Sequence, residues 1–150
     1  MTTQAQPRTT AGAVVLLTRL ARSVYRDVDQ EQLGMRLKEF VMLSIVGESG
    51  GTTQSQLGGV MGIDANSVVL LLNGLEGRGC AVRERDPQDR RRHIVRITPA
   101  GRKALVRAER ALEGVTDQAL ARLDDDERST LRMLLAKALG DGAYAAATTA

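Results

Sequence analysis

Apolar positions in the first half of the chain recur at helical spacing in four successive segments. From Ala11 to about Asp29, and again from about Met35 to Glu48, apolar residues return every three or four positions, as on one face of an amphipathic helix. The third segment begins at Thr53 with a capping-box arrangement, and the fourth begins with Asp64 as a helix N-cap. Two short helices joined by a glycine-containing turn predict a helix-turn-helix.

The pattern then changes to the alternation that is typical of short strands. Strands are expected from Cys80 to Arg85 and from Arg92 to Thr98, with the turn-rich, charged segment Asp86–Arg91 between them. Thr98 and Pro99 start a long helix that reaches about Leu123, and a final helix follows. The sequence therefore predicts a mainly α fold with a small β-hairpin. A helix-turn-helix followed directly by such a hairpin is a winged helix.

The composition narrows the class of function. Only Tyr25, Phe40 and Tyr144 are aromatic, which argues against single-strand nucleic-acid modules because these modules stack bases on aromatic side chains. Cys80 is the only cysteine, which excludes an intramolecular disulfide and a thiolate zinc cluster. His93 is the only histidine, which argues against a histidine metal site or a Ser-His triad. We therefore expect no enzyme activity and no cofactor.

Hydropathy and the chain ends give further expectations. No run of about 18 apolar residues is present, and Met1–Thr10 lacks the basic start and apolar stretch of a secretory signal. The sequence therefore predicts a cytoplasmic protein that does not contact a membrane. Residues 1–10 are expected to form a disordered arm, and residues 141–150 are expected to form a flexible tail.

The net charge of +3 is unevenly distributed along the chain. Residues 78–103 contain nine basic and three acidic residues, a net charge of +6, so the rest of the chain is at −3. A compact basic segment beside a helix-turn-helix is an electrostatic footprint for nucleic acid, and such binding weakens steeply as salt is raised. The alternative is that this segment is an ordinary charged surface hairpin.

Residues 86–101 carry a recognisable motif. Asp86-Pro87-Gln88-Asp89-Arg90-Arg91 precedes an apolar alternation that ends in Ile97-Thr98-Pro99-Ala100-Gly101, and this segment closely resembles the wing of MarR-family transcriptional regulators. Thr53–Leu57 and Leu75–Gly79 also match the family, and the resemblance extends from about Ala11 to Leu139. It implies a single domain over residues 11–140. Within it, a winged-helix DNA-binding lobe would occupy about 35–100, and dimerisation helices would occupy 11–30 and 101–140.

The resemblance also implies an obligate homodimer that binds a pseudo-palindromic operator in double-stranded DNA, most commonly as a repressor. The apolar stripes of the first, long and last helices exceed what one small winged helix needs, which independently indicates a dimer. In the family, the wing-tip arginine enters the minor groove and the aspartate two residues earlier orients it. These positions are Arg91 and Asp89 here. Arg90 and Arg92 are expected to contact phosphates; the alternative is that one of them takes the place of Arg91 at the tip.

The fourth helix takes the place of the recognition helix, which lies in the major groove. Its polar side chains are expected to hydrogen-bond base edges, and its apolar ones to pack on thymine methyl groups. The alternative is that Val69 or Leu70 is buried and the helix is rotated. Thr53, Gln54 and Ser55 start the preceding helix, where they are expected to contact a phosphate or only to cap the helix. The contacts expected on and just after the recognition helix are Asn66, Ser67, Val69, Leu70, Asn73 and Arg78.

Many MarR-like proteins lose DNA affinity when a small phenolic or aromatic carboxylate binds between the dimerisation helices and the winged helix. An anionic effector needs a cation, and Arg19 and Arg22 are the candidates unless they are solvated or paired with an acid such as Glu31. Cys80 is expected to be a buried small hydrophobe. The alternative functions are a cysteine-based redox sensor and a winged helix that binds protein but not DNA.

Overall fold

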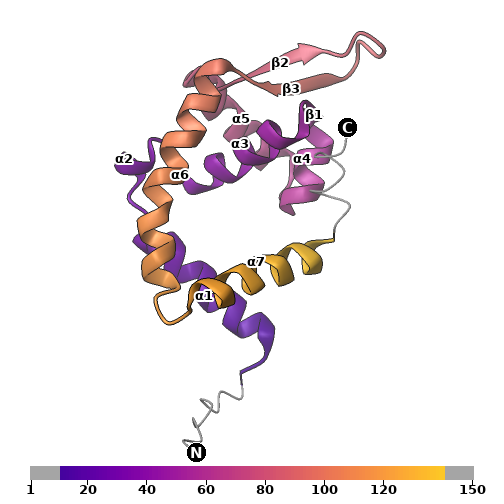
Figure 1. Ribbon diagram of the computed structural model, residues 1–150. Helices are drawn as coiled ribbons and strands as arrows, with labels where there is room; N and C mark the ends of the chain where they lie inside the picture. Colours follow the sequence, from indigo (N-terminus) through magenta and orange to yellow (C-terminus); the bar gives the residue numbers. More distant parts are fainter. Residues whose placement is uncertain (1–10, 141–150) are drawn as a thin grey trace, which may run out of the picture.

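A computed structural model describes residues 11–140, so the arm expected at 1–10 and the tail expected at 141–150 lie outside the described residues. The chain is mainly helical, with one small sheet (Figure 1). The helices are α1 (Ala13–Asp27), α2 (Gln30–Leu33), α3 (Leu37–Ser49), α4 (Gln54–Met61), α5 (Ala65–Gly77), α6 (Pro99–Ala119) and α7 (Asp125–Leu139). The strands are β1 (Thr52–Thr53), β2 (Ala81–Arg85) and β3 (His93–Ile97).

The sheet is a hairpin with one short additional strand. β2 pairs antiparallel with β3 so that Arg83 lies opposite Val95, and β1 pairs antiparallel with the other edge of β3. The strand order is therefore β1-β3-β2. The hairpin is the wing, and it projects beyond the helices (Figure 1). The winged-helix fold predicted from the sequence is confirmed.

The hydrophobic core lies between α3, α4, α5 and the sheet. Each fully buried apolar side chain gains about 1.5–3 kcal/mol of transfer free energy. Among the described residues, all buried apolar side chains lie between Leu33 and Ala108. The largest fully buried ones are Met42, Leu43, Val46, Leu57, Val68, Leu72, Leu75 and Val95. The segment from α3 to β3 therefore supplies most of its own core.

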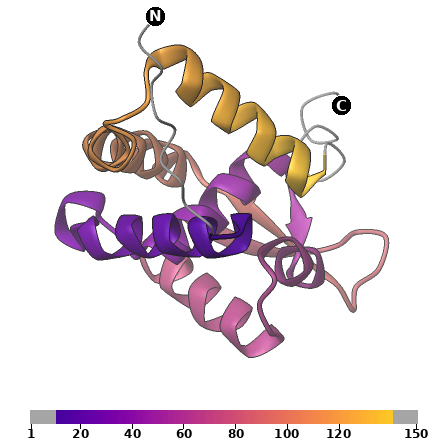
Figure 2. The same cartoon turned by 90° about the horizontal axis from the view of Figure 1, so that it is seen from below.

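α1 and α7 stand apart from this core, and neither helix has a buried residue. Figure 1 shows both at the end of the molecule away from the wing, with α6 running from the wing toward them, and Figure 2 shows the same two helices from below. Both helices nevertheless expose large apolar side chains. These are Val14, Val15, Leu16, Leu17 and Tyr25 on α1, and Met133, Leu134, Leu135 and Leu139 on α7.

The structure differs from the sequence prediction in short elements and at helix ends. The expected helix to Asp29 stops at Asp27, because the Asp29 carboxylate accepts the backbone N–H of Glu31 and caps the separate helix α2. β1 was not expected, since two residues are too few to show an alternating pattern. α6 ends at Ala119, and Leu123 lies in a turn closed by its N–H donating to the carbonyl of Leu120.

The base of the wing is packed closely against the start of α6. The Thr98 hydroxyl donates to the carbonyl of Gly79 at 2.6 Å and accepts the N–H of Gly101 at 2.9 Å. The N–H of Thr98 donates to the carbonyl of Cys80 at 3.0 Å. A Cβ on Gly101 would overlap that carbonyl, so this close approach requires glycine. The wing and the first turn of α6 therefore form one packed unit.

Among residues 11–140, no single helix is long and apolar enough to cross a membrane. α4 and α5 reach that length and composition only when they are taken together, and the chain bends by 109° between them. Within the same residues, no three His, Cys, Asp or Glu side chains gather as a set of metal ligands.

Candidate nucleic-acid interface

The wing tip holds an exposed arginine beside an aspartate. The Arg91 side chain is 93% exposed, and its Nε lies 3.3 Å from Oδ1 of Asp89. The same oxygen accepts the backbone N–H of Arg91 at 3.1 Å, and the N–H of Arg92 donates to the carbonyl of Asp89 at 3.0 Å. The turn itself therefore fixes the carboxylate that the guanidinium meets. The expected pair is present, and its contact with DNA stays a prediction.

The start of α4 faces the wing across a cleft of about 470 Å³. Thr53 and Gln56 form the expected capping box, in which Thr53 Oγ1 accepts the N–H of Gln56 at 3.2 Å and Gln56 Oε1 accepts the N–H of Thr53 at 3.0 Å. The N–H groups of a first helical turn lack acceptors within the helix, and the arginines across the cleft add positive charge, so the cleft suits a phosphate. Its lining residues are Thr53, Gln54, Ser55, Gln56, Arg91, Arg92 and His93.

α5 presents a partly apolar outer face. Leu70 is 68% exposed and Val69 is half-buried, so neither is buried as the alternative of a rotated helix required. Asn66 and Asn73 are exposed. Ser67 is engaged at the cap, because Asp64 accepts its N–H at 2.8 Å and its hydroxyl at 3.0 Å. These two hydrogen bonds hold the pKa of Asp64 below its ordinary value.

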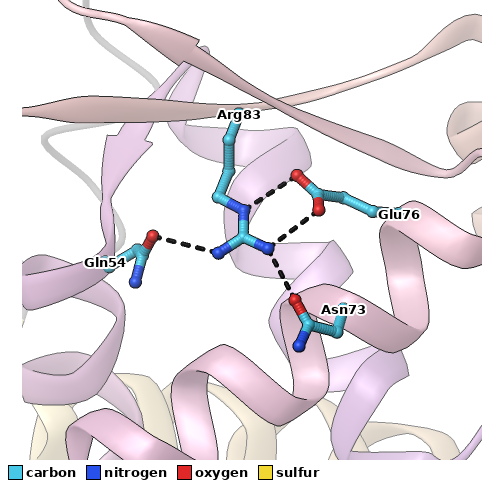
Figure 3. A network of polar contacts seen from close by, with 4 residues as sticks. All are labelled: Gln54, Asn73, Glu76 and Arg83. Carbon is cyan, nitrogen blue, oxygen red and sulfur yellow. Dashed lines mark hydrogen bonds and ion pairs between the residues drawn. The ribbon is translucent and has the colours of Figure 1, made fainter.

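Arg83 of β2 joins the wing to both helices of the helix-turn-helix (Figure 3). Its Nε and Nη2 donate to the two carboxylate oxygens of Glu76, each at 2.8 Å. Nη2 also donates to Oδ1 of Asn73 at 2.6 Å, and Nη1 donates to Oε1 of Gln54 at 3.4 Å. Donation from Arg83 lowers the pKa of the Glu76 carboxyl. The network brings two expected DNA contacts, Gln54 and Asn73, to one guanidinium.

The role of Arg83 was missed in the sequence, although a signal was present. Residues two apart in a strand share a face, and Arg83 shares its face with the buried Ala81. An arginine on the inward side of a strand needs an acidic partner, and Glu76 is near in the sequence. That pairing would have identified Arg83 as a residue that positions others.

Arg78 is half-exposed and pairs with a buried carboxylate. Its Nε lies 3.3 Å from Oε2 of the buried Glu39, and its Nη1 donates to the carbonyl of Gly34 at 3.1 Å. The guanidinium thus neutralises a buried carboxylate. The expected contact of Arg78 with DNA gains no support from this position, and we assign it a structural role instead.

A second cavity, of about 490 Å³, lies among α1, α3, α4 and α7. Lys38 is the only charged residue among the described residues that line it. Arg19 and Arg22, the cations expected at an effector site, are exposed on α1 and do not line this cavity. The remaining lining residues are Tyr25, Val41, Ile45, Gly59, Val60, Met61, Ile63 and Leu139.

Cys80 is 4% exposed, as expected for a small buried hydrophobe. Burial raises the pKa of its thiol. Because the thiolate is the reactive form, a raised pKa and a buried sulfur disfavour the alternative of a cysteine-based redox sensor.

Known proteins are similar to this chain in sequence and fold. The family model described as "MarR family" matches residues 35–93. A protein of Thauera aromatica named "Putative transcriptional regulatory protein for hcr operon" is 42% identical over 94 residues, which cover 63% of this chain and 57% of that protein. The solved transcriptional repressor CouR, bound to a 23-mer DNA duplex, is 30% identical with a TM-score of 0.71, over 84% of this chain and 91% of that chain. The chain belongs to the MarR family.

The part of this MarR-family chain that matches the family model runs from Met35 to the first residue of β3. It therefore contains the helix-turn-helix and the wing tip. A further similar structure is that of BpsR of Bordetella bronchiseptica, whose DNA binding is regulated by 6-hydroxynicotinic acid. BpsR is 25% identical, with a TM-score of 0.66 over 83% of this chain and 96% of that chain. The 94-residue match to the Thauera aromatica protein covers only 57% of that protein's length.

Proposed function

We propose that this MarR-family protein is a ligand-responsive transcriptional repressor that binds a pseudo-palindromic operator in double-stranded DNA as a homodimer. The observation that carries the proposal is that three expected DNA-contacting elements lie together. The cleft joins the start of α4 to the wing, and Arg83 joins both to α5. A duplex that followed this surface would meet the α4 start with a phosphate, α5 with its major groove and Arg91 with its minor groove.

The DNA-binding part of the proposal is tested by selection of bound duplexes from genomic fragments, followed by mobility-shift titration of the recovered operator. Arg91→Ala is expected to weaken operator binding more than about tenfold, because it removes a charge from a narrow minor groove. Arg36→Ala, which removes an exposed arginine outside the wing, α5 and the proposed dimerisation helices, is the matched control and should have little effect. Equal affinities for the wild type and Arg91→Ala would refute the assignment of Arg91. Failure to recover any duplex would favour a winged helix that binds only protein.

The exposed apolar faces of α1 and α7 support the homodimer. Contiguous apolar surface of this kind on a soluble protein is commonly covered by a partner, and a two-fold axis lets one face pair with its copy. Two recognition helices related by that axis would read half-sites about one helical turn apart. We therefore assign α1, α6 and α7 to dimerisation and the segment from α3 to β3 to DNA.

The ligand response is supported by the second cavity. Its volume of about 490 Å³ suits a small molecule, its walls are mainly aliphatic, and Lys38 supplies a cation for a carboxylate. The test is a thermal-shift screen of phenolic and aromatic carboxylates. A carboxylate that binds is expected to raise the unfolding temperature of the wild type and of Arg19→Ala, but not of Lys38→Gln. If Lys38→Gln showed the same rise in unfolding temperature as the wild type, or if Arg19→Ala showed none, the effector site would not be this cavity.

A further inference from the structure

Arg83 fixes what the amide groups of two expected DNA contacts can offer to a base. The guanidinium is anchored by both oxygens of Glu76 and reaches Asn73 of α5 and Gln54 of α4 (Figure 3). The Arg83 side chain is mostly buried, with 23% exposed, and the contact with Asn73 is the shorter of the two amide contacts. The orientation of Asn73 is therefore set within the protein before a duplex arrives.

The chemistry of arginine decides which end of each amide faces it. A guanidinium has five donors and no acceptor, so the amide atom within hydrogen-bond distance of Arg83 must be the oxygen. Figure 3 shows the amide nitrogens of Gln54 and Asn73 directed away from Arg83. Each side chain keeps an NH₂ group for a ligand, while its oxygen is already engaged.

This limits the base edges that Asn73 can read. An asparagine recognises adenine with two bonds, in which Oδ1 accepts from N6 and Nδ2 donates to N7. With Oδ1 engaged by Arg83, the bond that Oδ1 would accept from N6 is lost, and only donation from Nδ2 remains. Guanine and thymine remain suitable, because the polar atoms of their major-groove edges are acceptors only.

We propose that Arg83 is a specificity-determining positioning residue, which makes Asn73 a donor-only contact that selects guanine or thymine over adenine. Arg83 orients the amide of Gln54 in the same way, with its oxygen toward the guanidinium, through a longer hydrogen bond of 3.4 Å. The proposal rests on the proposed DNA binding and deepens it, since it assigns a base preference to one position on α5. In this proposal, the residue that sets the base preference, Arg83, lies on β2 of the wing and not on the recognition helix α5.

The test is selection from a randomised duplex library with the wild type, Asn73→Ala, Asn73→Asp and Arg83→Leu. The base position whose preference disappears in Asn73→Ala is the one that Asn73 reads. At that position the wild type is expected to select guanine or thymine, and Arg83→Leu is expected to shift the selection toward adenine by about fivefold or more. Asn73→Asp keeps an oxygen toward Arg83 but has no donor, so its affinity for the wild-type duplex should fall about tenfold.

Asn73→Asp also keeps the test independent of folding, because it preserves a partner for Arg83 whereas Arg83→Leu removes the Glu76 ion pair. Adenine at the Asn73-dependent position in the wild type would overturn the proposal. So would an unchanged motif in Asn73→Ala, or wild-type affinity in a folded Asn73→Asp. Recovery of no duplex by the wild type would overturn the proposed DNA binding itself, which distinguishes the two failures.

Discussion

The carboxylate of Glu39 gives Gly74 and Arg78 roles that their sequence positions did not reveal. Glu39 is 2% exposed, and its Oε2 accepts the N–H of Arg36 at 3.1 Å while it pairs with Arg78. A Cβ on Gly74 would overlap the other carboxylate oxygen, so glycine at this position lets α5 approach α3. Gly74 is therefore a packing position, and Arg78 is the cation that this packing requires.

Arg78→Ala should lower the free energy of unfolding by about 1–3 kcal/mol, because it leaves a buried carboxylate with fewer partners. The half-exposed position of the guanidinium keeps the loss below that of a fully buried pair. Urea denaturation measures this loss, and mobility-shift titration of the folded fraction should show operator affinity within about threefold of the wild type. If Arg78→Ala lost operator affinity tenfold while its free energy of unfolding stayed unchanged, Arg78 would be a DNA contact and not a structural residue. Arg91→Ala is the converse variant, with lost affinity and retained stability.

At the scale of elements, the wing is held against α5 by a charged clamp, Arg83 with Glu76. The Glu76 side chain is 32% exposed, and its pKa lies below the ordinary value of 4.5 because Arg83 donates to it. A carboxyl with a lowered folded-state pKa contributes stability that is complete above its unfolded-state pKa. That contribution is lost as the pH falls through the folded-state pKa.

Glu76→Gln is therefore expected to lower the free energy of unfolding by about 1–2 kcal/mol at pH 7, a range reduced for partial exposure. The difference from the wild type should shrink when the pH is taken below 4.5. Urea denaturation of both proteins at a series of pH values measures it. Glu84→Gln breaks an exposed cross-strand pair with Arg96 and serves as the control, with a loss under about 0.5 kcal/mol at pH 7. A Glu76→Gln effect that stayed constant into acid would contradict the clamp.

Elements with local signals could be predicted from the sequence. The capping box at Thr53, the N-caps at Asp64 and Thr98 and the wing strands all depend on residues close together in the chain, and all are present. β1 and α2 could not be predicted, because two and four residues carry no periodicity. β1 exists because Thr52 pairs with Val95, which is distant in the sequence.

The contacts within the candidate site also differ in whether they join residues close together or far apart in the sequence. Asp89 and Arg91 are two residues apart, so their pairing follows from the turn and could be anticipated. The partners of Arg83 and Arg78 include Gln54 and Glu39, which reach them only through tertiary packing. The cation of the second cavity depends on how α1, α3, α4 and α7 assemble, and for this reason sequence reasoning named Arg19 and Arg22 while the structure places Lys38 there.

At the scale of the whole molecule, α1 and α7 expose nine large apolar side chains. Leu134 is 54% exposed and Met133 is 64% exposed on α7, and Val14 is 76% exposed on α1. These side chains lie outside the core that α3, α4, α5 and the sheet build. The core therefore contains no side chain of α1 or α7, and the exposed apolar faces of these helices are the surface that the proposed homodimer would cover.

Leu134→Glu is expected to convert the dimer into monomers, because a charge in an apolar interface loses its hydration without gaining a partner. Sedimentation velocity over a concentration series measures the assembly, and operator affinity should fall with it. Val82→Glu places the same charge at a comparably exposed apolar site on the wing, 40% exposed, and should leave the dimer intact. A dimeric Leu134→Glu would move the interface to another face.

The joint between the wing and α6 has a mechanical consequence. The hydrogen bond from Thr98 and the close approach at Gly101 pack the hairpin tightly against the start of α6. α6 itself has 21 residues. At 1.5 Å per residue it is a rod about 30 Å long, so a tilt of about 10° displaces one end by about 5 Å relative to the other. In the proposed homodimer, the distance between the two wings along a duplex would therefore depend on the angle between the two α6 helices. A change in that angle would alter the distance between the wings without any change in the DNA-binding surface itself.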